Sequence, residues 1–143
     1  MTNKLRDFLD ESNRRNIATA YGTDFHNRLQ NIQLDNQSDE LVQRILANSD
    51  LARLFDTLSK SEVPIAGYIN NKFVSRRIDR LRIDMINKTI EILDYKTDIN
   101  HDARRAHYIA QLGEYKNLMS QIYPDFKITC FILWTHDWIL ERI

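Results

Sequence analysis

Hydrophobic and polar positions follow two different periods along the chain, and the period changes near residue 60. Before that point apolar residues recur three and four positions apart, as in Leu51, Leu54 and Phe55, which is the spacing of one face of a helix. After it, stretches appear in which apolar and polar residues alternate, which is the spacing of a strand. The pattern therefore predicts a helical N-terminal part over residues 1–60 and a sheet-containing part over residues 61–143.

Capping residues and apolar stripes divide the N-terminal part into four expected helices. They start near Leu5 (running toward Ala20), around His26, at Ser38 or Asp39, and at Ser49 or Asp50. In the second part we expect three strands, a long helix, a fourth strand and a short terminal element, the first five over Val63–Ile69, Phe73–Ile83, Thr89–Tyr95, Asp102–Tyr123 and Ile128–Trp134. No internal boundary is visible. The whole chain is expected to form one α/β (α+β) domain, a mixed central sheet flanked by helices.

One predicted hairpin carries acidic residues at the ends of its apolar rows. Side chains on a strand alternate between faces, so the row that begins with Ile90 ends in Asp94 and Lys96. The preceding strand has an apolar row that ends in Asp79. A two-residue turn at Ile86–Asn87 would set the register of the hairpin. The pairs that this register predicts are Ile83 with Ile90, Leu81 with Ile92, and Asp79 with Asp94.

The predicted Asp79–Asp94 pair is chemically informative because directly opposed residues hold their Cβ atoms about 5 Å apart. Two carboxylates at that distance repel each other, and either a shared proton or a bound cation relieves the repulsion. Lys96, two residues further on, makes a cation the better interpretation. The hairpin therefore predicts a metal site.

Five ordered segments of the chain resemble the RecB-type nuclease domain of the PD-(D/E)xK phosphodiesterases, and among these the AddA-type domains of bacterial double-strand-break repair. Together they run from about Gly22 to Trp134. The resemblance implies a restriction-endonuclease-like fold and hydrolysis of phosphodiester bonds in DNA, of the exonuclease type. The segments are Gly22-Thr23-Asp24-Phe25-His26, Ser61-Glu62-Val63-Pro64-Ile65, Ile78-Asp79-Arg80-Leu81, Leu93-Asp94-Tyr95-Lys96-Thr97, and Gln111 with Tyr115.

The same resemblance implies roles for residues of the metal site. Asp79, Asp94 and His26 would hold Mg²⁺ or Mn²⁺, supported by the backbone carbonyl of Tyr95. Oxygen-rich ligation with one imidazole suits these hard cations better than structural zinc. Lys96 would be the catalytic lysine, which positions the attacking water and stabilises charge on the phosphate.

Other residues are candidates for DNA contact. Gln111 and Tyr115 lie four residues apart on one helix face, and the family uses this pair beside its active site. The predicted second strand is basic, and Arg77 and Arg80 would lie along a phosphate backbone. Glu62, just before the first strand, is a further candidate for the site. The resemblance also implies a protein partner for this chain, either a helicase subunit or an AddB-like protein.

Two other classes of function stay open. The chain could keep the fold as an inactive or partner-dependent nucleic-acid-binding module, since Arg76 stands where the family usually has a glycine. It could instead be a structural domain whose acids pair with Arg77 and Arg80. No Gly-x-x-x-x-Gly-Lys phosphate loop is present, so ATP-driven unwinding is not expected of this chain. A free-standing nuclease, an excised domain and a split-gene fragment all fit.

The amino-acid composition indicates the class of protein and its compartment more clearly than it indicates a function. A hydrophobic content of 43% with 10% aromatic residues indicates a globular core, while a net charge of zero does not by itself indicate nucleic-acid binding. The single cysteine, Cys130, rules out an internal disulfide and the four-cysteine iron–sulfur cluster of some relatives. The charged start is unlike a signal peptide, and no apolar run could span a bilayer, so we expect a cytoplasmic, non-membrane protein.

Overall fold

The computed structural model describes Gly22 and residues 24–143, and the chain divides into two compact units, residues 1–31 and 32–143. In the described part of the first unit, residues 24–30 are helical, which agrees with the helix expected around His26. The helix expected from Leu5 toward Ala20 lies outside the described residues. The other described helices and the strands belong to the second unit.

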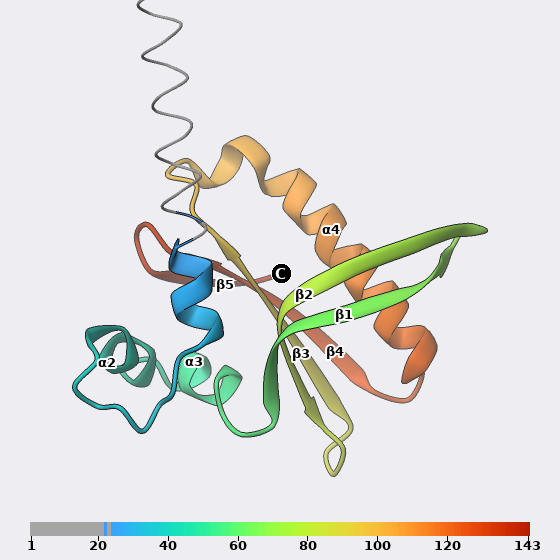
Figure 1. Ribbon diagram of the computed structural model, residues 1–143. Helices are drawn as coiled ribbons and strands as arrows, with labels where there is room; N and C mark the ends of the chain where they lie inside the picture. The colour runs from blue at the N-terminus through green and yellow to red at the C-terminus, as the bar shows by residue number, and fades with distance from the viewer. Residues whose placement is uncertain (1–21, 23) are drawn as a thin grey trace, which may run out of the picture. The chain divides into compact units, whose positions relative to one another are not determined.

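The second unit is a five-stranded mixed sheet with helices packed against it (Figure 1). The strands lie in the order β1-β2-β3-β4-β5, and all neighbours are antiparallel except β3 and β4. This confirms the expected α/β class with a mixed sheet flanked by helices. The elements are α2 (Glu40–Leu46), α3 (Ser49–Leu54), β1 (Ser59–Ile69), β2 (Lys72–Asp84), β3 (Thr89–Lys96), α4 (His101–Ile122), β4 (Lys127–Trp134) and β5 (Ile139–Arg142).

The helices begin where side chains satisfy their first backbone N–H groups. Asp39 caps α2 by accepting a hydrogen bond from the backbone N–H of Leu41, as expected. Asn48 caps α3, one residue before the expected Ser49, because its side-chain oxygen accepts from two backbone N–H groups. Asn100 caps α4 in the same way. The long helix α4 connects the parallel strands β3 and β4 and therefore covers one face of the sheet.

Alternation along β3 and β4 divides the buried side chains between the two faces of the sheet. Ile90 and Ile92 of β3 join the core cluster against α4. Their neighbours Leu93 and Tyr95 are buried on the opposite face, where the Tyr95 ring stacks on Phe55 with 6.4 Å between the ring centroids. On the α4 side the main cluster comprises Ile65, Ile78, Leu81, Ile90, Ile92, Tyr108, Leu112, Tyr115, Leu118, Met119, Ile128, Cys130, Ile132 and Trp134.

The hairpin of β2 and β3 has the predicted register but not the predicted turn. The structure pairs Ile83 with Ile90 and Leu81 with Ile92, so the register is confirmed at these positions. The loop has four residues, 85–88, and the prediction of a two-residue turn is wrong. The reason is local: the Asp84 carboxylate accepts hydrogen bonds from the backbone N–H groups of Ile86 and Asn87, which holds a wider loop closed.

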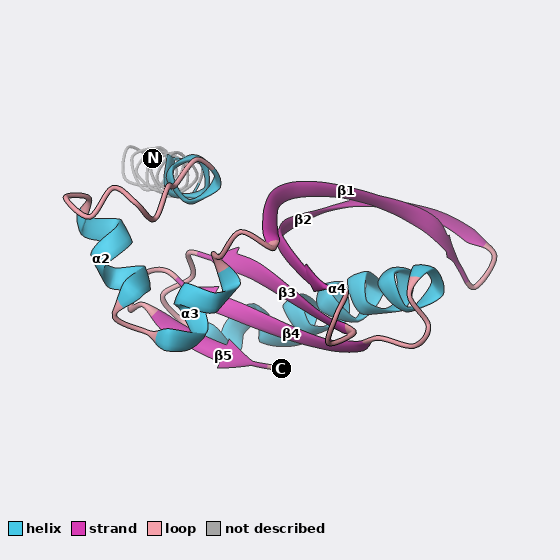
Figure 2. Cartoon of the chain, turned by 90° about the horizontal axis from the view of Figure 1, so that it is seen from below, coloured by secondary structure: helices cyan, strands magenta, loops and turns pink. Residues whose placement is uncertain are grey.

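The hairpin of β1 and β2 extends beyond the rest of the sheet. Because β2 pairs with β3 only through residues 80–84, residues 63–78 pair only with each other, and we call this segment the arm. The arm lies along α4 and closes with a two-residue turn, Asn70 and Asn71, both at positive φ (Figure 2). A Cβ atom at Gly67 would lie 3.0 Å from Leu118 of α4, so glycine permits this close approach.

In the part of the chain that the structure describes, no helix is both long and apolar enough to cross a membrane.

Candidate active site

The candidate site lies where β2 leaves β3. The last pair joining these strands is Arg80 with Leu93, and one step further the same register places Asp79 opposite Asp94. The Oδ2 atom of Asp79 accepts a hydrogen bond of 2.9 Å from the backbone N–H of Tyr95, which holds the Asp79 side chain against β3. The structure thus brings together the two acids that the sequence pairs.

Asp94 is the most perturbed group of the site. Its side chain is in the interior, with only 2% of the residue exposed. Burial is the main cause that raises the pKa of Asp94 to about 7, and the charge of Asp79 is the second. A hydrogen bond with Asp79 acts in the same direction, while nearby Lys96 opposes the rise. The two carboxyls therefore behave as a pair that holds one proton near neutral pH.

Lys96 is the positive charge beside this pair. Its Nζ atom lies 2.7 Å from Oδ2 of Asp94, an ion pair that lacks the angle of a directed hydrogen bond. Among the described residues no donor forms a hydrogen bond with that oxygen, although it is fully buried. Lys96 therefore supplies a positive charge to this oxygen without a directed hydrogen bond, and the oxygen can accept a metal ion as a further partner.

Side chains of α4 orient Lys96. Its Nζ atom donates to Oε1 of Gln111 at 3.1 Å, and Nε2 of Gln111 donates to the Tyr115 hydroxyl at 2.8 Å. The Tyr115 hydroxyl in turn donates to the backbone carbonyl of Arg77 in the arm, at 3.3 Å. Burial, and then the charges of Asp94 and Asp79, raise the pKa of Tyr115, so its hydroxyl stays protonated and able to donate. The predicted Gln111–Tyr115 pair therefore connects the lysine to the arm.

Tyr108 is a site residue that the sequence analysis missed. The Lys96 Nζ atom lies 4.3 Å from the centroid of its ring, and its hydroxyl donates to Asp98 at 2.6 Å. Burial and this hydrogen bond raise the pKa of Tyr108 to about 12. Its spacing is the signal that could have found it, because Tyr108 lies one helical turn before Gln111 and so shares its face of α4.

Glu62 occupies a strained position beside the two acids. The pairs Ser61–Arg80 and Val63–Ile78 on either side place Glu62 opposite Asp79, so three acids follow one row across β1, β2 and β3. Its φ of 54° is in the left-handed region, which non-glycine residues rarely adopt. Oε2 of Glu62 lies 3.7 Å from Nη1 of Arg77. No three His, Cys, Asp or Glu side chains of Gly22 and residues 24–143 are grouped closely enough to hold a metal ion by themselves.

The donor set fits Mg²⁺ better than an ion that needs a full protein cage. Mg²⁺ is commonly bound through one or two carboxylates, with water and substrate phosphate completing its coordination. Asp79 and Asp94 supply two carboxyls within hydrogen-bonding reach of each other, and one of them has the buried oxygen described above. Replacing their shared proton by a cation would remove the repulsion between them.

The two arginines predicted to contact DNA differ in accessibility. The Arg77 side chain is exposed on the arm. Arg80 is buried, with 6% exposed, on the face of the sheet away from α4. Its guanidinium lies 4.0 Å from the centroid of the Phe55 ring, and its Nε donates to the Tyr95 hydroxyl at 3.1 Å. In this arrangement Arg80 braces the interior and is not presented to a ligand.

His26 belongs to the first unit, so its predicted place in the site is not tested. Its Nδ1 atom lies 2.9 Å from the backbone carbonyl of Gly22, an interaction in which only the ring N–H can donate. In the neutral ring this tautomer places the lone pair on Nε2, which is the arrangement that metal-binding histidines use. The role of His26 as a ligand stays a prediction, as does that of the Tyr95 carbonyl.

The sequence analysis also missed a charged network at the other end of β3. Glu91 accepts from Arg53 at 2.7 Å and lies 3.3 Å from Nη1 of Arg82, and Arg82 also pairs with Asp56 at 2.9 Å. We call Arg53, Asp56, Arg82 and Glu91 the arginine network. Part of it lines an open groove of about 490 Å³ that contains none of the predicted site residues.

No protein-family model matches the chain, and no curated protein does.

Proposed function

We propose that the chain is a Mg²⁺- or Mn²⁺-dependent deoxyribonuclease that hydrolyses phosphodiester bonds. The observation that carries the proposal is the Asp79–Asp94 pair, with a buried carboxylate oxygen lacking a hydrogen-bond donor and the Lys96 ammonium 2.7 Å away. A strongly perturbed acid beside a specific charge partner is typical of functional sites. The order of acid, acid and lysine along β2 and β3 is the order that the resemblance requires.

Each residue of the site has a chemical task in this proposal. Asp79 and Asp94 would bind the divalent cation, which when bound lowers the pKa of a coordinated water and neutralises charge on the scissile phosphate. Lys96 would orient that water and stabilise the additional negative charge of the transition state. Gln111, held by Tyr115, keeps the lysine ammonium pointed at the site.

The finer parts of the proposal rest on the resemblance alone. These are exonuclease-type cleavage in double-strand-break repair in the bacterial cytoplasm, with a helicase subunit or an AddB-like protein as partner. His26 would supply a third ligand, and Glu62, opposite Asp79 in the strand register, is the alternative source. Arg77 would contact the DNA backbone.

A second function is favoured by one observation. Because the described residues offer only two grouped carboxyls, a partner or the DNA itself could be needed to complete the metal site. The chain would then be a nucleic-acid-binding module that cuts only in a complex. Metal binding without cleavage by the isolated chain is the result that this alternative requires.

The test is cleavage of linear and circular DNA, single- and double-stranded, with Mg²⁺, Mn²⁺ or EDTA. We expect metal-dependent cutting that disappears in Asp94→Ala and in Lys96→Ala, with circular dichroism unchanged. Asp125→Asn, at an exposed position away from the site, is the matched control for removing a charge. Wild-type activity in either site variant contradicts the proposal. Neither cutting nor metal binding would favour an inactive module.

A further inference from the structure

The outer face of the arm is a row of exposed side chains. Three cross-strand pairs of residues turn away from α4, and all six residues in these pairs are exposed. The alternate positions Ile65 and Ile78 are buried against the helix. Such a face contributes little to the core, so its composition is free to serve an interaction. Its pairs are Pro64 with Arg77, Ala66 with Ser75, and Tyr68 with Phe73.

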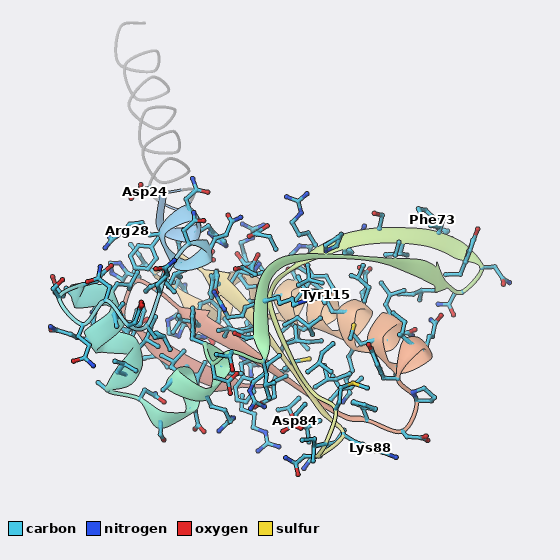
Figure 3. All side chains as sticks on the ribbon, turned by 60° about the horizontal axis from the view of Figure 1, so that its bottom comes forward. Asp24, Arg28, Phe73, Asp84, Lys88 and Tyr115 are labelled. Carbon is cyan, nitrogen blue, oxygen red and sulfur yellow. The ribbon has the colours of Figure 1, made fainter. Side chains whose placement is uncertain are left out.

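Two aromatic rings lie at the far end of this face. Tyr68 is 64% exposed and Phe73 is 65% exposed, and their ring centroids are 5.7 Å apart with the rings edge to face. Figure 3 shows Phe73 at the end of the arm, away from the core. Aromatic side chains normally contribute stability through burial, so a cross-strand pair kept in water is a candidate contact surface.

The arm presents these rings on a rigid support. The Asn70–Asn71 turn has the left-handed backbone of a tight hairpin, and the Nε2 atom of Gln121 in α4 donates to the Tyr68 carbonyl at 2.9 Å. Further back, Nε of Arg76 bonds to Glu114 of α4 at 3.0 Å. A preorganised surface binds with a smaller loss of conformational entropy than a flexible loop does.

Charge identifies the kind of partner. Residues 63–78 contain three cations, Lys72, Arg76 and Arg77, and no acidic residue. Lys72 is exposed at the tip, in the pair with Ile69 that adjoins the aromatic pair, and Arg77 is exposed on the outer face at the base, 3.7 Å from Glu62. Flat rings flanked by cations match a polyanion that has its own flat rings, which is a strand of nucleotides with unpaired bases. In a duplex the bases are stacked on each other and cannot lie on these rings.

We propose that the outer face of the arm binds single-stranded nucleic acid, whose bases stack on Tyr68 and Phe73 while Lys72 and Arg77 contact its phosphates. Arg77 is about 13 Å from Phe73 along an extended strand, and its carbonyl accepts the Tyr115 hydrogen bond at the candidate active site. The inference rests on the proposed function and deepens it, since it makes unpaired nucleotides the substrate that the arm leads to the site.

The test is binding of a fluorescein-labelled oligothymidine strand, followed by anisotropy in EDTA so that no cleavage occurs, with a duplex of equal length for comparison. We expect the strand to bind more tightly than the duplex, and Tyr68→Ala/Phe73→Ala to weaken its binding about tenfold or more. The matched control is Met85→Ala/Ile86→Ala, which removes two exposed apolar side chains from the loop of the other hairpin and should change nothing. Lys72→Ala should lower the salt dependence.

A third variant separates stacking from plain hydrophobic contact. Tyr68→Leu/Phe73→Leu keeps apolar area but removes both ring faces, and we expect it to bind as weakly as the alanine variant. Unchanged binding in either double variant, or equal affinity for the duplex, overturns the inference. A dimer in sedimentation velocity that the alanine variant abolishes, with strand binding unaffected, also overturns it and makes a second copy of the chain the occupant.

Cleavage in Mg²⁺, measured separately, distinguishes this failure from failure of the proposed function. Strand binding that depends on the two rings, without any cleavage, would leave the arm inference standing and rule out cleavage by the isolated chain. Cleavage that depends on Asp94, with binding unaffected by either double variant, would do the reverse.

Discussion

The two ends of β3 carry charged clusters of opposite design. In the arginine network the guanidiniums of Arg53 and Arg82 both pair with Glu91, Arg82 also pairs with Asp56, and Arg53 also pairs with the exposed Asp50, at 2.7 to 3.3 Å. The hydrogen bond to Glu91 is the main cause that raises the pKa of Arg53 further above its already high value. In the Asp79–Asp94–Lys96 cluster two carboxyls share one ammonium, and the pKa of Asp94 rises to about 7. In the first cluster the nearly buried Glu91 has two cations as partners. In the second the buried Asp94 has one cation and a second carboxyl beside it, so only there does a proton or a metal ion have to offset an excess of negative charge.

This difference indicates that the arginine network stabilises the fold and that the Asp79–Asp94–Lys96 cluster is the candidate for binding and catalysis. The guanidinium–carboxylate pairs of the arginine network connect α3 to β2 and β3, and each of its buried charges already has a partner of opposite sign. A buried carboxylate beside a second carboxylate lowers the stability of the fold unless a proton or a cation compensates the negative charge. A structural domain would gain by replacing Asp94 with an apolar residue, so the excess charge points to a ligand.

The largest expected effect is on cleavage. Asp94→Ala removes one of the two proposed ligands, and Lys96→Ala removes the charge that would stabilise the transition state. Each should lower the cleavage rate by at least about 10²–10³-fold, since lost electrostatic stabilisation of a transition state has this magnitude. Rates are measured on linear DNA in Mn²⁺, and Asp125→Asn should retain the wild-type rate. If a variant of the arginine network lowered the cleavage rate as much, the two clusters would not differ in function.

The next largest effect is on stability in the arginine network. Glu91→Ala leaves two guanidiniums without the carboxylate they share, and one of them, Arg82, is nearly buried. We expect the free energy of unfolding to fall by about 2–4 kcal/mol, the range for a broken buried pair reduced for the partial exposure of Arg53. Urea denaturation measures it. A change below about 0.5 kcal/mol would show that the network is not structural.

Asp94→Asn should have the opposite sign. With EDTA present, the folded protein holds a proton on the Asp79–Asp94 pair up to about pH 7, while the unfolded chain releases it near the ordinary value of 3.8. At this site the unfolded state thus binds fewer protons in this window, so the contribution of Asp94 to stability falls as pH rises from about 4 to 7 and then levels off. Asparagine removes that loss. At pH 8 the variant should be more stable by on the order of 2 kcal/mol, and near pH 4 equal.

Thermal unfolding of both proteins at pH 4, 6 and 8 checks this sign. Mn²⁺ should raise the midpoint of the wild type at pH 8 and leave Asp94→Asn unchanged, because only the wild type has the acid pair. A stability difference between Asp94→Asn and the wild type that does not grow from pH 4 to pH 8 would contradict the raised pKa of Asp94.

The acid pair could be predicted from sequence because a strand period is a local property. Alternation along β2 and β3 fixes which residues share a face, and the apolar rows then fix the register, whatever the loop between them. The loop itself was predicted wrongly because its length depends on side-chain bonds from Asp84 to Ile86 and Asn87. Such bonds leave no periodic trace in the sequence.

Other parts of the site depend on contacts between distant segments. Arg53 and Glu91 are 38 residues apart, and no local sequence pattern around either residue predicts their ion pair. Helical spacing puts Tyr108 on the same face of α4 as Gln111, but its contact with Lys96 depends on how α4 packs against β3. Arg80 was grouped with Arg77 by charge, yet β2 turns its side chain to the opposite face, against Phe55. Composition reports charge but not the direction in which it points.

The smallest expected effect tests whether α4 or the acids hold Lys96 in place. Tyr115→Phe removes a hydroxyl that accepts from Gln111 and donates to the Arg77 carbonyl, so stability should fall by about 1–2 kcal/mol. Gln111 loses its anchor, and Lys96 its second partner, so cleavage should slow about tenfold with Mn²⁺ affinity unchanged. Tyr123→Phe, near the other end of α4, is the matched control. An unchanged rate would mean that attraction to Asp94 alone positions the lysine, and the excess charge of the cluster would then suffice to organise it.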